Sequence, residues 1–67
     1  MTMLGTYKTT RERSFRIGNW ITFTLPIGSP VQITQVDKTC NKVLVNFNDE
    51  YSDWMHELIL NDLELVS

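Results

Sequence analysis

The chain has 67 residues, a formal net charge of −2, 42% hydrophobic residues and 21% charged residues. This length allows one domain, and the balance of apolar and charged residues excludes a disordered polypeptide. A single cysteine excludes an intramolecular disulfide, and the negative net charge argues against a general coat for nucleic acid.

No apolar run is long enough to span a bilayer, and the N-terminus has no basic-then-apolar secretion signal. We therefore expect a soluble, cytoplasmic protein. A core of this size rarely nets more than ~3–5 kcal/mol without support from a disulfide, a metal or another chain. A protein partner is thus a reasonable expectation, and so is a homo-oligomer.

Residues 1–10 are rich in threonine and show no sustained periodicity. We expect a loose N-terminal arm there, or a short edge strand. The rest of the chain, residues 11–67, is expected to form a single domain, since no linker or repeat interrupts it.

Apolar residues then recur at odd positions on both sides of Gly18 and Asn19. They are Phe15, Ile17, Ile21, Phe23 and Leu25. This spacing predicts either one long strand bent at a bulge or two strands that turn at Gly18 and Asn19. Trp20 falls on the opposite phase, so we expect it to point away from the core.

Residues 30–47 predict a β-hairpin that follows a loop rich in proline and glycine. Its two arms alternate apolar and polar residues, and the polar residues 37–41 supply the turn. The phase slips at Gln35, which predicts a bulge near residues 34–35.

Residues 52–60 fit two patterns, because the same apolar residues satisfy helical and strand spacing. The preceding strands have short connections, so we predict a fourth strand and an all-β fold. The alternative is an α+β fold with a helix at about 52–60. A one-turn 3₁₀ helix at 60–63 and a short strand at 64–66 are expected to follow.

Residues 28–33, 42–47 and 60–66 would then form the second strand, the third strand and the closing turn with its strand. In this layout the chain resembles the SH3-like small β-barrels. The resemblance implies a small barrel of four to five short antiparallel strands with a one-turn 3₁₀ element near the C-terminus. It implies no proline-rich ligand, because the Ala-Leu-Tyr-Asp-Tyr type signature of peptide-binding SH3 domains is absent.

Catalysis has little support in the sequence. Cys40 and His56 are its single cysteine and single histidine, and they lie in different predicted elements. Zinc sites need several such ligands, and phosphate loops need clustered glycines. We therefore expect no enzyme, no cofactor and no metal.

An acidic aromatic cluster follows the hairpin. It comprises Asp49, Glu50, Tyr51, Asp53 and Trp54. Aromatic faces and carboxylates both attract cations, so this cluster and Trp20 predict a surface for a partner protein bearing arginine or lysine. The alternative is that Trp54 is a core anchor and Tyr51 its lid.

The opposite end of the chain is basic and could contact phosphates or an acidic partner. Its cations are Lys8, Arg11, Arg13 and Arg16. On a strand, Arg11 and Arg13 would project to the same face. One alternative is that these charges lie on an edge strand, where they discourage aggregation with other sheets. Another is that the cations attract the acidic C-terminal third of the chain.

These observations favour a non-enzymatic protein-binding module or small accessory subunit. One alternative is an inhibitor encoded by a phage or mobile element, whose acidic third mimics nucleic acid and acts on a host nucleic-acid machine. Another is direct binding of nucleic acid through the basic N-terminal segment.

Overall fold

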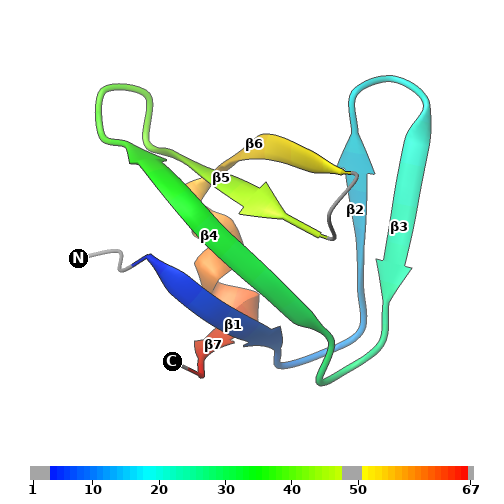
Figure 1. Ribbon diagram of the computed structural model, residues 1–67. Helices are drawn as coiled ribbons and strands as arrows, with labels where there is room; N and C mark the ends of the chain where they lie inside the picture. Colours follow the sequence, from blue (N-terminus) through cyan, green and yellow to red (C-terminus); the bar gives the residue numbers. More distant parts are fainter. Residues whose placement is uncertain (1–3, 48–50, 67) are drawn as a thin grey trace.

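The structure, a computed structural model, describes residues 4–47 and 51–66 and is all-β within them (Figure 1). Its elements are β1 (Gly5–Thr9), β2 (Arg13–Ile17), β3 (Ile21–Leu25), β4 (Pro30–Asp37), β5 (Lys42–Asn46), β6 (Ser52–His56), the 3₁₀ helix η1 (Glu57–Asp62) and β7 (Leu63–Leu65). The all-β prediction is confirmed, and the alternative helix at 52–60 is not formed. The described residues contain seven strands rather than the four to five expected, because the N-terminal segment and the Gly18 turn each add one.

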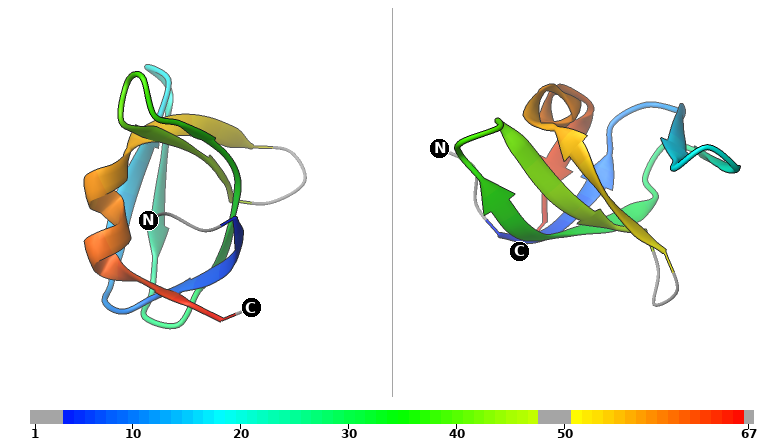
Figure 2. Two further views of the ribbon diagram at one scale, coloured as in Figure 1. Left: turned by 90° about the vertical axis from the view of Figure 1, so that its left-hand side faces the viewer. Right: turned by 90° about the horizontal axis from the view of Figure 1, so that it is seen from above.

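Five strands form one antiparallel sheet in the order β6-β5-β4-β1-β7. Figure 2 shows that this sheet is strongly curved, with η1 and the β2–β3 hairpin across its concave side. Eight side chains form the core between them: Tyr7, Phe15, Val31, Ile33, Val43, Val45, Ile59 and Leu63. The alternation predicted for the two arms of the central hairpin therefore identifies the core face correctly.

The N-terminal segment lies inside this sheet. β1 pairs with β4 on one side and with β7 on the other, and Tyr7 and Thr9 are buried. The expectation of a loose arm or edge strand is therefore wrong for Gly5–Thr9. Sequence periodicity missed this strand because one of its two inward side chains is a threonine, whose burial depends on hydrogen-bond partners elsewhere in the chain.

The β4–β5 hairpin has the predicted bulge, since its register shifts between Ile33 and Gln35. Its turn is fixed by Asp37, whose Oδ1 accepts hydrogen bonds from the backbone N–H groups of Thr39 and Cys40. Asn41 completes the turn in the left-handed region, with φ of 55°. Asparagine tolerates this conformation better than most residues, which explains its position here.

The odd-position apolar residues form two strands rather than one. β2 and β3 pair from Arg13 with Leu25 to Ile17 with Ile21, and Gly18 makes the turn with φ of 59°. This hairpin packs on the main sheet through side chains. The ring of Phe15 lies 5.2 Å from that of Phe47, and the ring of Phe23 stacks on the same ring at 5.7 Å.

The C-terminal elements follow the predicted order, with η1 and β7 each beginning earlier than expected. β6 leads directly into η1, because His56 Nδ1 accepts a hydrogen bond from the Leu58 N–H and caps the 3₁₀ helix. One face of η1 places Ile59 in the core. Leu63 then enters the core at the start of β7.

Thr9, which precedes the β2–β3 hairpin, is hydrogen-bonded to the loop that follows it. Its buried hydroxyl donates to the Pro26 carbonyl at 2.7 Å and accepts from the Ser29 N–H at 2.9 Å. Its backbone N–H donates to the Ser29 carbonyl, and its carbonyl accepts from the Gly28 N–H. The loop that leads out of the hairpin is thus attached to the end of β1 by four hydrogen bonds.

Replacing Thr9 with valine tests this attachment. The side chain keeps its shape, but the Ser29 N–H and the Pro26 carbonyl lose a partner in a partly buried site. We expect the free energy of unfolding to fall by about 1–3 kcal/mol, measured by chemical denaturation. Thr9→Ser keeps the hydroxyl and is expected to lose less; equal losses in the two variants would show that the methyl group, not the hydroxyl, matters.

Candidate functional site

Trp20 is the most exposed large hydrophobic residue in the described structure, at 92%. It lies at the tip of the β2–β3 hairpin, directly after the Gly18 turn. The expectation that it points away from the core is confirmed. Beside it, the guanidinium of Arg16 donates a long hydrogen bond of 3.4 Å to the Asn19 carbonyl.

Asp53 fixes this tip to the main sheet. Its Oδ2 accepts a hydrogen bond from the Gly18 N–H at 3.2 Å, and its Oδ1 accepts one from the Trp54 N–H at 2.8 Å. Both carboxylate oxygens are therefore engaged by the protein's own backbone. The structure thus gives Asp53 a positioning role at the hairpin and does not leave its carboxylate unpaired for a cationic partner.

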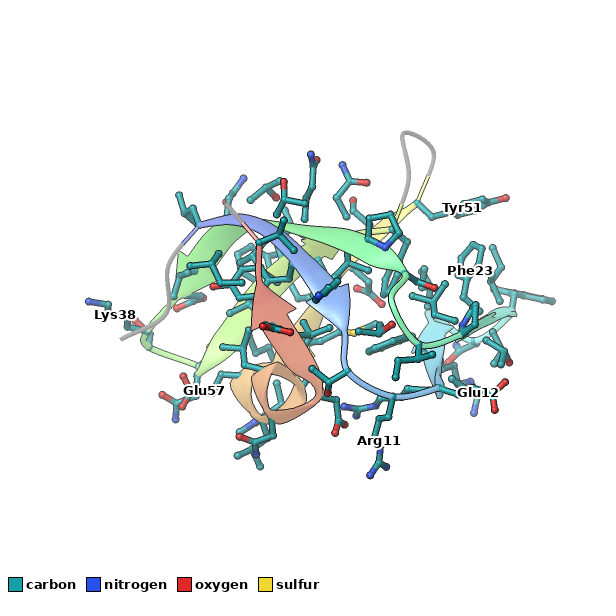
Figure 3. The ribbon with its side chains drawn as sticks, turned by 90° about the horizontal axis from the view of Figure 1, so that it is seen from below. Arg11, Glu12, Phe23, Lys38, Tyr51 and Glu57 are labelled. Carbon is teal, nitrogen blue, oxygen red and sulfur yellow. The ribbon has the colours of Figure 1, made fainter. Side chains whose placement is uncertain are left out.

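Tyr51 also supports the hairpin. Its ring meets the ring of Phe23 edge to face, with 5.2 Å between the ring centres, and Figure 3 shows the two side chains close together. Phe23 in turn stacks on Phe47. This chain of rings connects the hairpin to β6 and β5, so Trp20 stands on a hairpin held by both hydrogen bonding and aromatic contacts.

Trp54 lies on the outer face of β6, opposite to the face that carries Asp53. It pairs across the sheet with Leu44 and is 39% exposed. The alternative that Trp54 anchors the core is therefore wrong. Tyr51 lies one residue before β6 and its ring contacts Phe23 of the hairpin, whereas Trp54 lies beside Leu44 on the outer face of the sheet.

The predicted acidic aromatic cluster is thus divided. Asp53 and Tyr51 hold the hairpin, Trp54 lies on the outer face of the sheet, and Asp49 and Glu50 lie outside the described residues. Sequence reasoning also missed Ile27, which is 70% exposed in the loop after β3. The sequence held one signal for this exposure, because Ile27 lies between a proline and a glycine in a predicted surface loop.

The basic segment is largely paired with acidic side chains. Arg13 forms a short ion pair with Asp62 Oδ2, Arg11 Nε lies 3.5 Å from Asp62 Oδ1, and Lys8 Nζ lies 3.6 Å from Glu64 Oε2. The guanidinium of Arg13 also lies 5.1 Å from the centre of the Phe15 ring. Arg11 and Arg13 reach the same carboxylate, although Arg11 precedes β2 and does not share a strand with Arg13. Attraction between the two ends of the chain is therefore observed.

The single cysteine and histidine come from neighbouring segments, since the Glu57 N–H donates to the Asn41 carbonyl. His56 Nδ1 is occupied by its bond to Leu58, and no hydrogen bond joins the imidazole to the exposed Cys40 thiol. Within residues 4–47 and 51–66, no three metal-ligating side chains gather, and no helix is long and apolar enough to cross a membrane.

Comparisons with models of protein families, with curated proteins and with solved structures each found no match to this chain. Its function has to be inferred from its own residues.

Replacing Asp53 with alanine tests its role at the hairpin. The Gly18 and Trp54 N–H groups lose their acceptor, so we expect both amides to exchange with solvent faster and the protein to lose ~1 kcal/mol of stability. Amide hydrogen exchange followed by NMR measures this. Ser52→Ala, at an exposed position on the same strand, is the control; unchanged exchange at Gly18 in Asp53→Ala would contradict the assigned role.

Replacing Asp62 with alanine releases Arg11 and Arg13. We expect this variant to bind a single-stranded DNA oligonucleotide more tightly than the wild type at low salt. The slope of log K against log salt should steepen by roughly one phosphate contact, about 0.7, for each arginine that engages. Fluorescence anisotropy over a range of salt concentrations measures both quantities.

The matched control is Asp37→Ala, which removes the same charge at the β4–β5 turn. Equal binding by the two variants would show that net charge alone, and not release of these arginines, governs the interaction. Circular dichroism checks that both variants remain folded.

Proposed function

We propose that this protein is a non-enzymatic protein-binding module, or a small accessory subunit, which recognises another protein through the β2–β3 hairpin. The observation that carries the proposal is the 92% exposure of Trp20 at a tip that Asp53 holds in place. Tryptophan is among the residues most enriched at the energetic centres of protein interfaces.

The support beneath Trp20 strengthens the proposal. Binding through a disordered segment costs free energy, because side chains and backbone must be ordered as the complex forms. Here the Gly18 N–H bond to Asp53 and the ring contacts of Phe23 fix the hairpin before any partner arrives. An exposed indole on such a support loses little conformational entropy on binding.

One element supports the resemblance to SH3-like small barrels. A 3₁₀ helix precedes the last strand, as the resemblance implies, whereas the described residues form seven strands rather than four to five. Such barrels serve many functions, so the fold is compatible with the proposed function and does not select it.

The two nucleic-acid hypotheses receive less support. Lys8, Arg11 and Arg13 each lie beside a carboxylate, which offsets part of the positive charge that phosphates would meet. The same pairs neutralise Asp62 and Glu64, which reduces the acidic surface that mimicry of nucleic acid would need.

Affinity capture with matched variants tests the proposed function. The wild type, Trp20→Ser and Trp54→Ser serve as baits, and binding of each recovered protein is then measured by calorimetry. We expect a partner that Trp20→Ser binds at least about 30-fold more weakly, because truncating such an anchor costs 2 kcal/mol or more. Trp54→Ser removes the same side chain from the outer face of the sheet and should bind normally. Equal binding by all three proteins would overturn the assignment of the hairpin.

A further inference from the structure

Each strand of the hairpin has one edge without a partner strand in the described part of the chain, and the edge of β3 is the outer one. β3 pairs with β2 along its whole length, and no other strand of the described residues pairs with its second edge. Figure 1 shows β3 on the outer side of the hairpin, with β2 between it and the five-stranded sheet. A strand added to β3 would therefore extend the hairpin away from the body of the molecule.

This edge lacks the protection found on the other exposed strands. β2 carries two charged residues, Arg13 and Arg16, and on β6 the carboxylate of Asp53 occupies the Trp54 N–H. β7 is only three residues long. β3 has five residues, Ile-Thr-Phe-Thr-Leu, without a charge, a proline or a glycine. Proteins generally blunt open edges with such features, and an unprotected edge is available for pairing with another chain.

We propose that the partner of the β3 edge is a second copy of this chain, paired antiparallel about a two-fold axis at Phe23. The inference rests on the proposed function, because it names the protein that the hairpin recognises. Ile21 then lies opposite Leu25 of the second copy, Thr22 lies opposite its Thr24, and the two Phe23 residues lie opposite each other.

The composition of β3 suits this arrangement. Read from Phe23 in either direction it presents a threonine and then a branched aliphatic residue, so every cross-strand pair matches like with like. Aromatic pairs, hydroxyl pairs and aliphatic pairs each stabilise antiparallel strands, and no like charges meet. All three pair types already occur within the hairpin. Phe15 lies opposite Phe23, Ile17 lies opposite Ile21, and the hydroxyls of Ser14 and Thr24 are 3.0 Å apart.

The same register brings together the exposed apolar side chains beside β3. Continued by one residue, it places Trp20 opposite Pro26 of the second copy, and one residue further it places Asn19 opposite Ile27. Trp20 and Ile27 are 92% and 70% exposed in the single chain. Both lie in the turns at the two ends of β3, so antiparallel pairing about Phe23 brings Trp20 of each chain toward the Ile27 end of the other, in a symmetric interface that closes on itself.

The interface is small, because it comprises residues 19–27 of each chain. Interfaces below the standard size are characteristic of weak or transient association. The dimer is therefore expected to dissociate in the micromolar range or above, so that concentration decides how much of the protein is paired.

Two double variants test the register directly. In Thr22→Glu/Thr24→Glu, like charges meet at both threonine pairs, whereas in Thr22→Glu/Thr24→Lys opposite charges meet there. Thr22 lies opposite Arg16 within the hairpin, so the shared glutamate substitution is acceptable inside each chain. Sedimentation velocity over a wide concentration range measures association, and circular dichroism checks the fold.

We expect the wild type and the Glu/Lys variant to dimerise, and the Glu/Glu variant to dimerise at least about tenfold more weakly. A wild type that stays monomeric up to millimolar concentration would overturn the inference, and so would equal dimerisation of the two variants. If the wild type is monomeric but captures a different protein in a Trp20-dependent manner, the proposed function holds and the second copy is excluded as the partner.

Cross-linking gives a test that does not depend on charge. Thr22→Cys and Thr24→Cys are made separately in a Cys40→Ser background, mixed and oxidised. Residues directly opposite on antiparallel strands have Cβ atoms at a spacing close to that of a disulfide. The mixture should give a covalent heterodimer well above the amount of dimer that either variant forms alone; equal yields would contradict the register.

Discussion

The hydroxyl of Thr9 is the interaction on which the arrangement of the hairpin depends. The chain leaves the main sheet just after this residue and returns at Ser29, and the hydroxyl and backbone of Thr9 join both points from inside the protein. Every feature proposed for recognition lies between them. The polar side chain of Thr9 at the base of the β2–β3 hairpin therefore determines the position of the Trp20 side chain at its tip.

Beyond that base, side chains position the hairpin. The rings of Phe15, Phe23, Phe47 and Tyr51 pack its inner face against the sheet, and Asp53 receives the N–H of Gly18 at its tip. No backbone ladder joins β2 to the five-stranded sheet within the described residues. The hairpin is thus a separate two-stranded unit fixed at its base, along its inner face and at its tip, which leaves the outer edge of β3 open.

The regular parts of the fold could be predicted because their apolar residues alternate. Val43 and Val45 identify the central hairpin, and the phase slip at Gln35 identifies its bulge. β1 could not be found in this way, because the burial of Thr9 depends on Pro26 and Ser29, which lie far along the chain. The pairs of Arg13 with Asp62 and of Lys8 with Glu64 likewise depend on the topology and have no local signal.

The candidate site was less predictable than the core. Tyr51, Asp53 and Trp54 are close in sequence, and grouping them ignored the period of the predicted strand, which places Asp53 and Trp54 on opposite faces. Asp53 was included in the cluster because of its charge, but its carboxylate accepts hydrogen bonds from two backbone N–H groups. The outward position of Trp20 was predicted correctly, because its phase relative to Phe15 and Phe23 is a local property.

The central position of β1 has a consequence for how the protein folds. β1 is made first during synthesis, but its neighbours are β4 and β7, and the β7 pairing joins Tyr7 to Leu65 across nearly the whole described chain. Contacts so distant in sequence slow folding, because a long loop must close before they contribute. While a ribosome is still making the last strand, one edge of β1 therefore has no partner. Until β7 emerges and covers that edge, the nascent chain exposes an unpaired strand to association with other chains.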